Sequence, residues 1–155
     1  MAVAADTKIT DSEWEVMRVV WANQEVTSKE IIDVLEQKKA WKPATTKTFI
    51  GRLVKKGMLN TKKDGNRYLY STDVSEVAFV KAMFNDLFDN VCDRQKGDVV
   101  AYLLSQIRLS FADVEKITTI LTEKETEAVD LVPCNCLPGQ CHCKIIKEEN
   151  DHEKN

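Results

Sequence analysis

At 155 residues the chain is long enough for one ordinary domain or two small ones, and a hydrophobic content of 43% is enough for a packed core. Every apolar run is shorter than the about 20 residues of a membrane-spanning helix, and residues 1–10 lack the basic flank and apolar stretch of a signal peptide, so we expect a cytoplasmic protein without a membrane partner. The net charge of −3 divides unevenly: residues 1–72 carry 13 Lys and Arg against 9 Asp and Glu, whereas residues 73–155 carry 9 against 16.

Three helices are predicted in the first 57 residues. Thr10 and Thr27 each stand three residues before a glutamate, which is the capping-box pattern. Apolar residues follow each of them at helical spacing. A third helix has Pro43 in its first turn and ends at Gly57, where a glycine favours termination.

The period of the pattern changes after Gly57. Residues 58–63 and 67–71 are predicted to be short strands, and Asp64-Gly65-Asn66 between them is typical of a hairpin turn. Three helices followed by a hairpin is the order of elements in a winged helix-turn-helix. Residues 1–72 are therefore predicted to be a winged-helix DNA-binding domain.

Three further helices follow, so the predicted fold class is mainly α with a small β-hairpin. Asp73 and Glu76 form a capping pattern for the fourth, residues 96–106 form the fifth, and Ser110 caps the sixth. Three short helices bury their apolar stripes poorly within about 55 residues. Residues 73–128 are therefore predicted to be a helical dimerisation domain, with a self-contained subdomain as the alternative, and residues 129–155 are predicted to be a flexible tail.

The third helix and the hairpin carry the candidate DNA contacts. Between Lys38 and Arg67 there are ten basic residues and one acidic residue, which favours a confined polyanion-binding face, although a solvated lysine-rich surface has the same composition. In helix-turn-helix proteins the start of the second motif helix reads the bases, and basic side chains bind phosphates and guanine edges. The predicted DNA-binding residues are Ala44, Thr45, Lys47, Thr48, Arg52, Lys55, Lys62, Lys63 and Arg67. A two-fold dimer would place two such helices on a pseudo-palindromic operator.

The tail contains a Cys-x-Cys-x4-Cys-x-Cys motif, formed by Cys134, Cys136, Cys141 and Cys143. Residues two apart in an extended chain point to the same side, and Pro-Gly suits the centre of a type II turn between the two pairs. In a reducing cytosol such a cluster indicates metal binding more than disulfides. Thiolates select zinc, Cu(I) or iron–sulfur clusters, so zinc and Cu(I) are the expected ions. A structural zinc clip and a redox switch are the alternatives.

Two other residues near the motif receive lesser predictions. His142 stands between two of the cysteines and is interpreted as a bystander rather than a ligand. Cys92 stands alone at the apolar end of a predicted helix, so it is predicted to be a packing residue.

The sequence also resembles a known family. Residues 14–21 (WEVMRVVW) and 47–57 (KTFIGRLVKKG) are similar to the penicillinase-repressor (BlaI/MecI) family, and the cysteine tail is similar to its copper-responsive, CopY-type branch. The resemblance implies a homodimeric winged-helix repressor of a copper-homeostasis operon that encodes copper-exporting ATPases. It implies that the zinc-loaded form binds the operator. It further implies that two Cu(I) ions from a copper chaperone displace zinc from the four tail cysteines and release the DNA.

Three other functions compete with this prediction. A β-lactam-responsive repressor would share the first part of the chain but would not need the thiolate tail. A zinc sensor would use the same four cysteines. A thiol enzyme or metal chaperone is disfavoured because the sequence has no Cys-x-x-Cys pair and no catalytic constellation, and its second histidine, His152, lies in the polar end. The chain is therefore not expected to be an enzyme.

Overall fold

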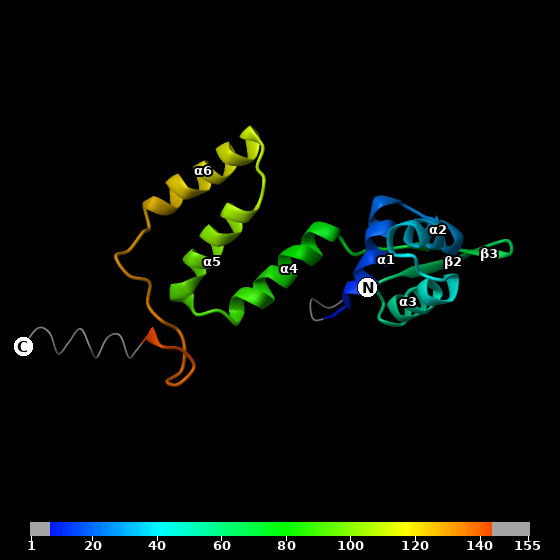
Figure 1. The fold of residues 1–155 in the computed structure, drawn as a ribbon, viewed down its shortest axis with the longest axis horizontal. Coiled ribbons are helices and arrows are strands. Elements are labelled where there is room, and N and C mark those ends of the chain that lie inside the picture. The colour runs from blue at the N-terminus through cyan, green and yellow to red at the C-terminus, as the bar shows by residue number, and fades with distance from the viewer. Residues whose placement is uncertain (1–6, 144–155) are drawn as a thin grey trace, which may run out of the picture. The chain divides into compact units, whose positions relative to one another are not determined.

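The computed structural model describes residues 7–143, which form two compact units that divide after Phe84 (Figure 1). The first unit contains α1 (Asp11–Ala22), β1 (Val26–Thr27), α2 (Ser28–Lys39), α3 (Pro43–Lys55), β2 (Asn60–Asp64) and β3 (Arg67–Ser71). Helix α4 (Glu76–Asp89) crosses the division, and the second unit also contains α5 (Asp93–Gln106) and α6 (Phe111–Glu125). The predicted fold class, mainly helical with a small sheet, is confirmed.

The helices of the first unit begin and end where the sequence indicates. At α1 the hydroxyl of Thr10 accepts from the Glu13 amide at 3.2 Å while the Glu13 carboxylate accepts from the Thr10 amide at 2.9 Å. The same reciprocal box starts α2 at Thr27. Helix α3 has Pro43 in its first turn, and Gly57 just beyond its end has a φ of +75°, a conformation that costs a glycine little.

The sheet has three strands in the order β1-β3-β2, one more than the predicted hairpin. Strands β2 and β3 pair antiparallel, with Asp64 opposite Arg67 across a two-residue turn whose first residue, Gly65, has a φ of +61°. Strand β1 pairs Val26 with Tyr70. Two residues are too few to show a period of two in the sequence, which explains why this strand was not predicted.

The core of the first unit lies where α1, α2 and α3 meet under the sheet. Its most buried apolar side chains are Val16, Met17, Val20, Ile31, Leu35, Ile50, Leu53 and Met58. Burying each of them contributes about 1.5–3 kcal/mol relative to exposure. The core therefore fixes which face of α3 is turned inward.

An ion pair between Glu13 and Lys56 lies at one end of this core. Glu13 is only 1% exposed, and its carboxylate accepts a hydrogen bond of 2.6 Å from the Lys56 ammonium. Burial raises the pKa of Glu13, but the hydrogen bonds from Lys56 and the Thr10 amide outweigh it and hold that pKa below its ordinary value. The pair ties the start of α1 to the end of α3.

An aromatic cluster joins the winged-helix elements to the first turns of α4. Trp14 and Trp21 pack edge to face with ring centroids 5.9 Å apart, and Phe79 packs on both. The indole N–H of Trp21 donates to the Val74 carbonyl at 2.9 Å. The beginning of α4 is thus held by packing and by one directional bond.

The helices of the second unit differ from the prediction at two boundaries. The hydroxyl of Ser75, not the carboxylate of Asp73, accepts from the third amide of α4, at 3.3 Å. Helix α5 begins at Asp93, three residues before the predicted start, and Cys92 is its N-cap. At α4, the hydroxyl of Ser75 is a favoured cap and lies next to the helix. At α5, the mixed polar sequence after Cys92 shows no apolar period from which the first turn could be predicted. Ser110 caps α6 with a capping box, as predicted.

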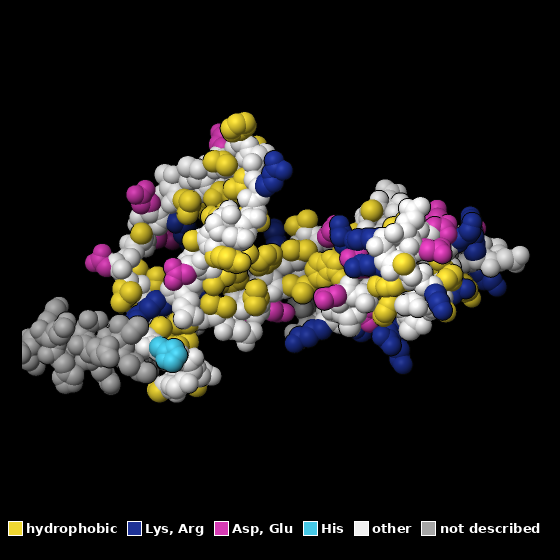
Figure 2. Space-filling model, in the orientation of Figure 1, with side chains coloured by type: hydrophobic (Ala, Val, Ile, Leu, Met, Phe, Trp, Pro, Cys, Tyr) yellow, Lys and Arg dark blue, Asp and Glu magenta, His cyan; other side chains and the backbone are white. Residues whose placement is uncertain are grey.

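The helices of the second unit keep much apolar surface open to solvent. No residue of α4, α5 or α6 is buried in the single chain. Apolar side chains are spread along these helices in Figure 2, and Phe111 at the start of α6 is 97% exposed. Between residues 7 and 143 no helix is both long and apolar enough to cross a membrane.

Candidate nucleic-acid interface and metal centre

The outer face of α3 carries the side chains predicted to read DNA. Ala44, Lys47, Thr48, Arg52 and Lys55 are exposed, and Thr45 is half-buried. The opposite face was predicted to contain Phe49, Ile50, Leu53 and Val54. Of these, Ile50 and Leu53 are buried, while Phe49 and Val54 are half-buried at its margins.

Two threonines of α3 have distinct hydrogen-bonding states. Thr46 is fully buried, and its hydroxyl has no hydrogen-bond partner among the described residues. The Thr48 hydroxyl donates to the Ala44 carbonyl at 3.0 Å, within its own helix. In this structure Thr48 therefore presents its methyl group and an acceptor oxygen to the surface.

Arg52 stacks on an aromatic ring and forms no ion pair within residues 7–143. Its guanidinium carbon lies 5.7 Å from the centre of the Phe49 ring, and that ring packs on Trp41 at 5.0 Å between centroids. A cation over an aromatic face gains about 0.5–1 kcal/mol at an exposed site. The arrangement keeps the planar fork of Arg52 extended on the outer surface of α3.

The hairpin adds three predicted cations of unequal availability. Lys62 and Lys63 on β2 are exposed and form no ion pair among the described residues. Arg67 on β3 donates to the Asp64 carboxylate across the turn, with N–O distances of 3.0 and 3.1 Å. Asp64 is the acidic residue inside the basic segment, and it compensates part of the charge of Arg67.

A shallow groove separates α3 from the hairpin. Lys47 and Gly51 line it from α3, and Thr61 and Tyr68 line it from the strands. Lys47 therefore faces this groove together with the hydroxyl-bearing side chains of Thr61 and Tyr68, and Figure 2 shows dark blue Lys and Arg side chains on the surface of the first unit.

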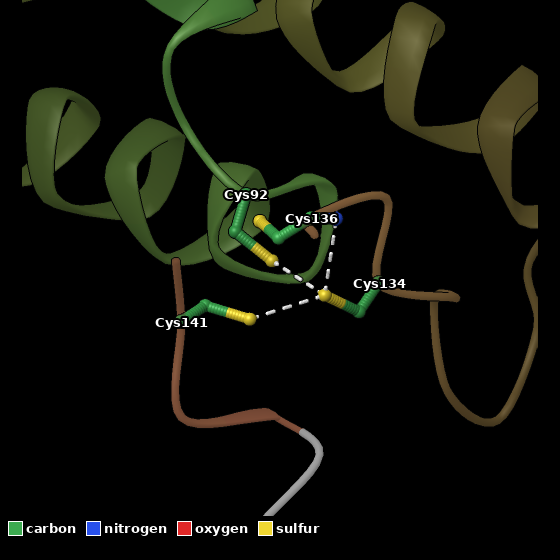
Figure 3. A group of neighbouring side chains, drawn as sticks. All are labelled: Cys92, Cys134, Cys136 and Cys141. Carbon is green, nitrogen blue, oxygen red and sulfur yellow. Dashed lines mark hydrogen bonds between the residues drawn. The ribbon is translucent and has the colours of Figure 1, made fainter. Parts of the chain in front are cut away.

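The second unit brings cysteine thiols into one cluster (Figure 3). The possible ligand atoms of Cys92, Cys134, Cys136 and Cys141 all lie within 4.8 Å of one another. The Sγ of Cys134 is 3.3 Å from that of Cys141 and 3.6 Å from that of Cys92. The Sγ of Cys143 is 3.6 Å from that of Cys92. All five cysteines of the chain therefore meet here.

The tail reaches this arrangement through a turn and several anchors. The Gln140 amide donates to the Leu137 carbonyl at 3.1 Å, and Gly139 has a φ of +91°, as the Pro-Gly order predicts. The side chain of Asn135 accepts from the Asp93 amide at 3.0 Å. Arg94 donates to the Val132 carbonyl at 3.1 Å. The first turn of α5 thus holds the tail beside the cluster.

The sulfur positions fit a four-coordinate thiophilic ion. Four sulfurs around zinc at about 2.3 Å in a tetrahedron lie about 3.8 Å apart; three sulfur pairs of the cluster are 3.3 to 3.6 Å apart, and the four grouped sulfurs all lie within 4.8 Å of one another. Burial and hydrogen bonds among the thiols raise the pKa of Cys136 to about 12. Hydrogen bonds, first to Cys92, and burial raise the pKa of Cys143 to about 12. The backbone amide of Cys143, followed by other hydrogen bonds, lowers the pKa of Cys141.

Cys92 is the residue of this cluster that the sequence did not reveal. It was predicted to be a packing residue, and it is indeed buried, but its thiol is one of the four grouped sulfurs. It lies 42 residues before Cys134, so no spacing motif connects them. His142 lines a hollow beside the cluster without belonging to the grouped ligands, and His152 lies outside the described residues.

Comparisons with known proteins match the chain over most of its length. The model of the family described as penicillinase repressor matches residues 9–123. An uncharacterized 16.5 kDa protein of Latilactobacillus sakei is 44% identical over 142 residues, covering 92% of this chain and 96% of that protein. The penicillinase repressor of Bacillus licheniformis is 28% identical over 116 residues, covering 75% of this chain and 91% of that protein.

Among solved structures, the solution structure of the DNA-binding domain of the repressor BlaI is 38% identical. It covers 44% of this chain and 84% of that chain, with a TM-score of 0.43. The family match confirms the resemblance seen in residues 14–21 and 47–57, and with it the prediction that the chain is not an enzyme. The chain belongs to the penicillinase-repressor (BlaI/MecI) family of DNA-binding transcriptional repressors.

Proposed function

We propose that this protein is a copper-responsive repressor of the family. It binds a pseudo-palindromic operator as a zinc-loaded homodimer in the cytoplasm and leaves the DNA when Cu(I) replaces zinc in the thiol cluster. The observation that carries the proposal is the gathering of thiols at distances that suit a thiophilic ion. The tail residues Cys134, Cys136, Cys141 and Cys143 supply the ligands. A copper chaperone is the proposed Cu(I) donor.

The position of the cluster in the chain supports a sensing role. The family match ends at residue 123, so the tail cysteines lie beyond the part shared with the penicillinase repressors. A repressor that is controlled without a metal needs no such cluster. Thiolates bind Cu(I) and zinc in preference to hard ions such as magnesium and calcium, so the cluster gives this chain an input that the shared part lacks.

The exposed surfaces support the other parts of the proposal. The apolar side chains of α4, α5 and α6 are unburied in the single chain, and a second copy would cover them. Residues 73–128 are therefore proposed as the dimerisation domain. Residues 1–72 contact the operator through the nine predicted residues of α3 and the hairpin, and two copies related by a two-fold axis would contact two half-sites.

The test is a titration of zinc-loaded protein on operator DNA with Cu(I), in which released zinc and DNA binding are followed in the same sample. We expect both signals to change together near two Cu(I) per chain. A parallel titration with excess zinc separates the copper sensor from a zinc sensor, because only the latter releases DNA when zinc is added. Retention of zinc, or retention of the DNA after zinc has left, would refute copper-driven release.

A further inference from the structure

Cys92 lies at the N-terminal end of α5, immediately before its first residue, where the other capped helices of the chain have a serine or threonine. It is the N-cap of α5, with a φ of −53° and a ψ of 131°, and its side chain makes no capping hydrogen bond. The caps of α1, α2 and α6 are Thr10, Thr27 and Ser110, and each of these hydroxyls accepts from a helix amide. Hydroxyl and carboxylate side chains are the favoured N-caps. A cysteine at this position gives up a cap of about 1 kcal/mol.

The thiol of Cys92 instead points into the sulfur cluster. It is 6% exposed, and its Sγ lies 3.6 Å from that of Cys134 and 3.6 Å from that of Cys143. It therefore contacts one cysteine from each pair of the tail motif (Figure 3 shows the contact with Cys134). The backbone around it is fixed independently of any ion, because Asn135 and Arg94 already join the tail to the first turn of α5.

We propose that Cys92 is a metal ligand, and that the bound ion ties the tail to the N-terminus of α5. The proposal rests on the metal centre of the proposed function but not on copper release. The positive end of the helix dipole favours a negatively charged thiolate at this position. A tetrahedral ion binds four of the five thiols, so in the zinc form Cys92 takes the place of one of the four tail cysteines named in the proposed function, and one tail sulfur stays unbound.

The ligand count is measured on the full chain with cobalt(II) as the probe. Absorption from sulfur-to-cobalt charge transfer grows with the number of bound thiolates. A fifth thiol beside the site could replace a lost ligand in a single variant, so Cys92 is tested in the background of Cys143→Ser, which leaves the four grouped cysteines. We expect Cys143→Ser to keep the wild-type absorption and Cys92→Ser/Cys143→Ser to lose about one quarter of it, as removal of one of four ligands requires. The zinc affinity of the double variant falls below that of Cys143→Ser by more than about tenfold in a chelator competition.

Folding is separated from metal binding by the chemistry of the N-cap. Serine and asparagine are both better N-caps than cysteine, so Cys92→Ser and Cys92→Asn should keep the helical content and thermal stability of the metal-free protein. Hydrogen exchange gives a second readout. Zinc should slow exchange of the amides of Asp93 and Arg94 in the wild type, and in Cys143→Ser if that sulfur is the unbound one, but not in either Cys92 variant.

Three outcomes decide the matter. Loss of one thiolate on adding Cys92→Ser to Cys143→Ser, with unchanged metal-free folding, supports the proposal. If Cys143→Ser alone loses one thiolate and adding Cys92→Ser removes nothing further, the proposal is overturned, and the copper-responsive function stays intact on the four tail cysteines. A wild-type chain without thiolate absorption on cobalt loading overturns both the ligand and the proposed metal centre.

Discussion

The double variant Lys62→Ala/Lys63→Ala, which lacks both lysines of β2, should show a weaker dependence of operator affinity on salt concentration than the wild type. Five predicted DNA-contacting cations in each chain have no ion pair among the described residues: Lys47, Arg52, Lys55, Lys62 and Lys63. Ten such contacts in a dimer give a slope of log K against log salt of about −9. Removing two per chain lowers its magnitude by about 3.6.

That change is large enough to measure directly. Between about 50 and 200 mM salt, the loss of affinity should shrink from about 10⁵-fold in the wild type to about 10³-fold in the variant. Anisotropy of a labelled operator, recorded at four or five salt concentrations, gives the slope. Both lysines are exposed, so their removal should alter folding stability by no more than about 0.5 kcal/mol.

Lys124→Ala is a control outside the predicted DNA interface, because it removes one exposed cation from α6, where that lysine forms an ion pair with Glu127. Its slope should equal that of the wild type. If Lys62→Ala/Lys63→Ala keeps the wild-type slope, the hairpin does not contact phosphates and the assignment of β2 to the DNA interface is wrong.

Three further predictions test other parts of the structure. Glu13→Gln should lower the free energy of unfolding by about 1–3 kcal/mol in a urea titration, because the Lys56 ammonium loses its charged acceptor. The pKa of Glu13 is depressed, so its contribution is complete above the ordinary value of 4.5 and is lost as the pH falls below that value; an unchanged acid-unfolding midpoint in Glu13→Gln would contradict this. Asp64→Asn should free Arg67 and strengthen operator binding, with a slope steeper by about 0.9 per chain, whereas an unchanged slope would show that Arg67 stays away from phosphates. Phe111→Glu should shift the protein toward monomer in sedimentation, since a charge replaces a fully exposed phenyl ring; a variant that stays as dimeric as the wild type would place Phe111 outside the interface.

The winged-helix part could be predicted because its signals are local. Capping boxes at Thr10 and Thr27, Pro43 and Gly57 each constrain only a few neighbouring residues, and the structure places the helix ends beside them. Strand β1 lacked such a signal. Its two residues become a strand only because β3 offers hydrogen-bonding partners more than 40 residues later.

The thiol cluster shows the same division between local and distant information. The turn at Gly139 follows from Pro-Gly, and it explains why the two tail pairs approach each other. No spacing motif marks Cys92, because its contacts with Cys134 and Cys143 arise from the docking of the tail on the first turn of α5. A cysteine in place of the usual hydroxyl at an N-cap was the available signal, but the predicted start of the helix at residue 96 concealed it.

The aromatic contacts of the first unit also allow intrinsic tryptophan fluorescence to report on structural changes in the protein. Its three tryptophans occupy two distinct environments: Trp14 and Trp21 pack on Phe79 in the first turns of α4, while Trp41 packs on Phe49, the ring over which the guanidinium of Arg52 lies. Indole emission responds to polarity and to nearby charge. If Arg52 moves from Phe49 to a DNA base, the fluorescence emission of Trp41, which packs on the same ring, should change. If α4 separates from α1, the emission of Trp14 and Trp21 should change instead. Phenylalanine replacements can therefore resolve, without any attached dye, which end of the winged helix responds first when the repressor leaves its operator.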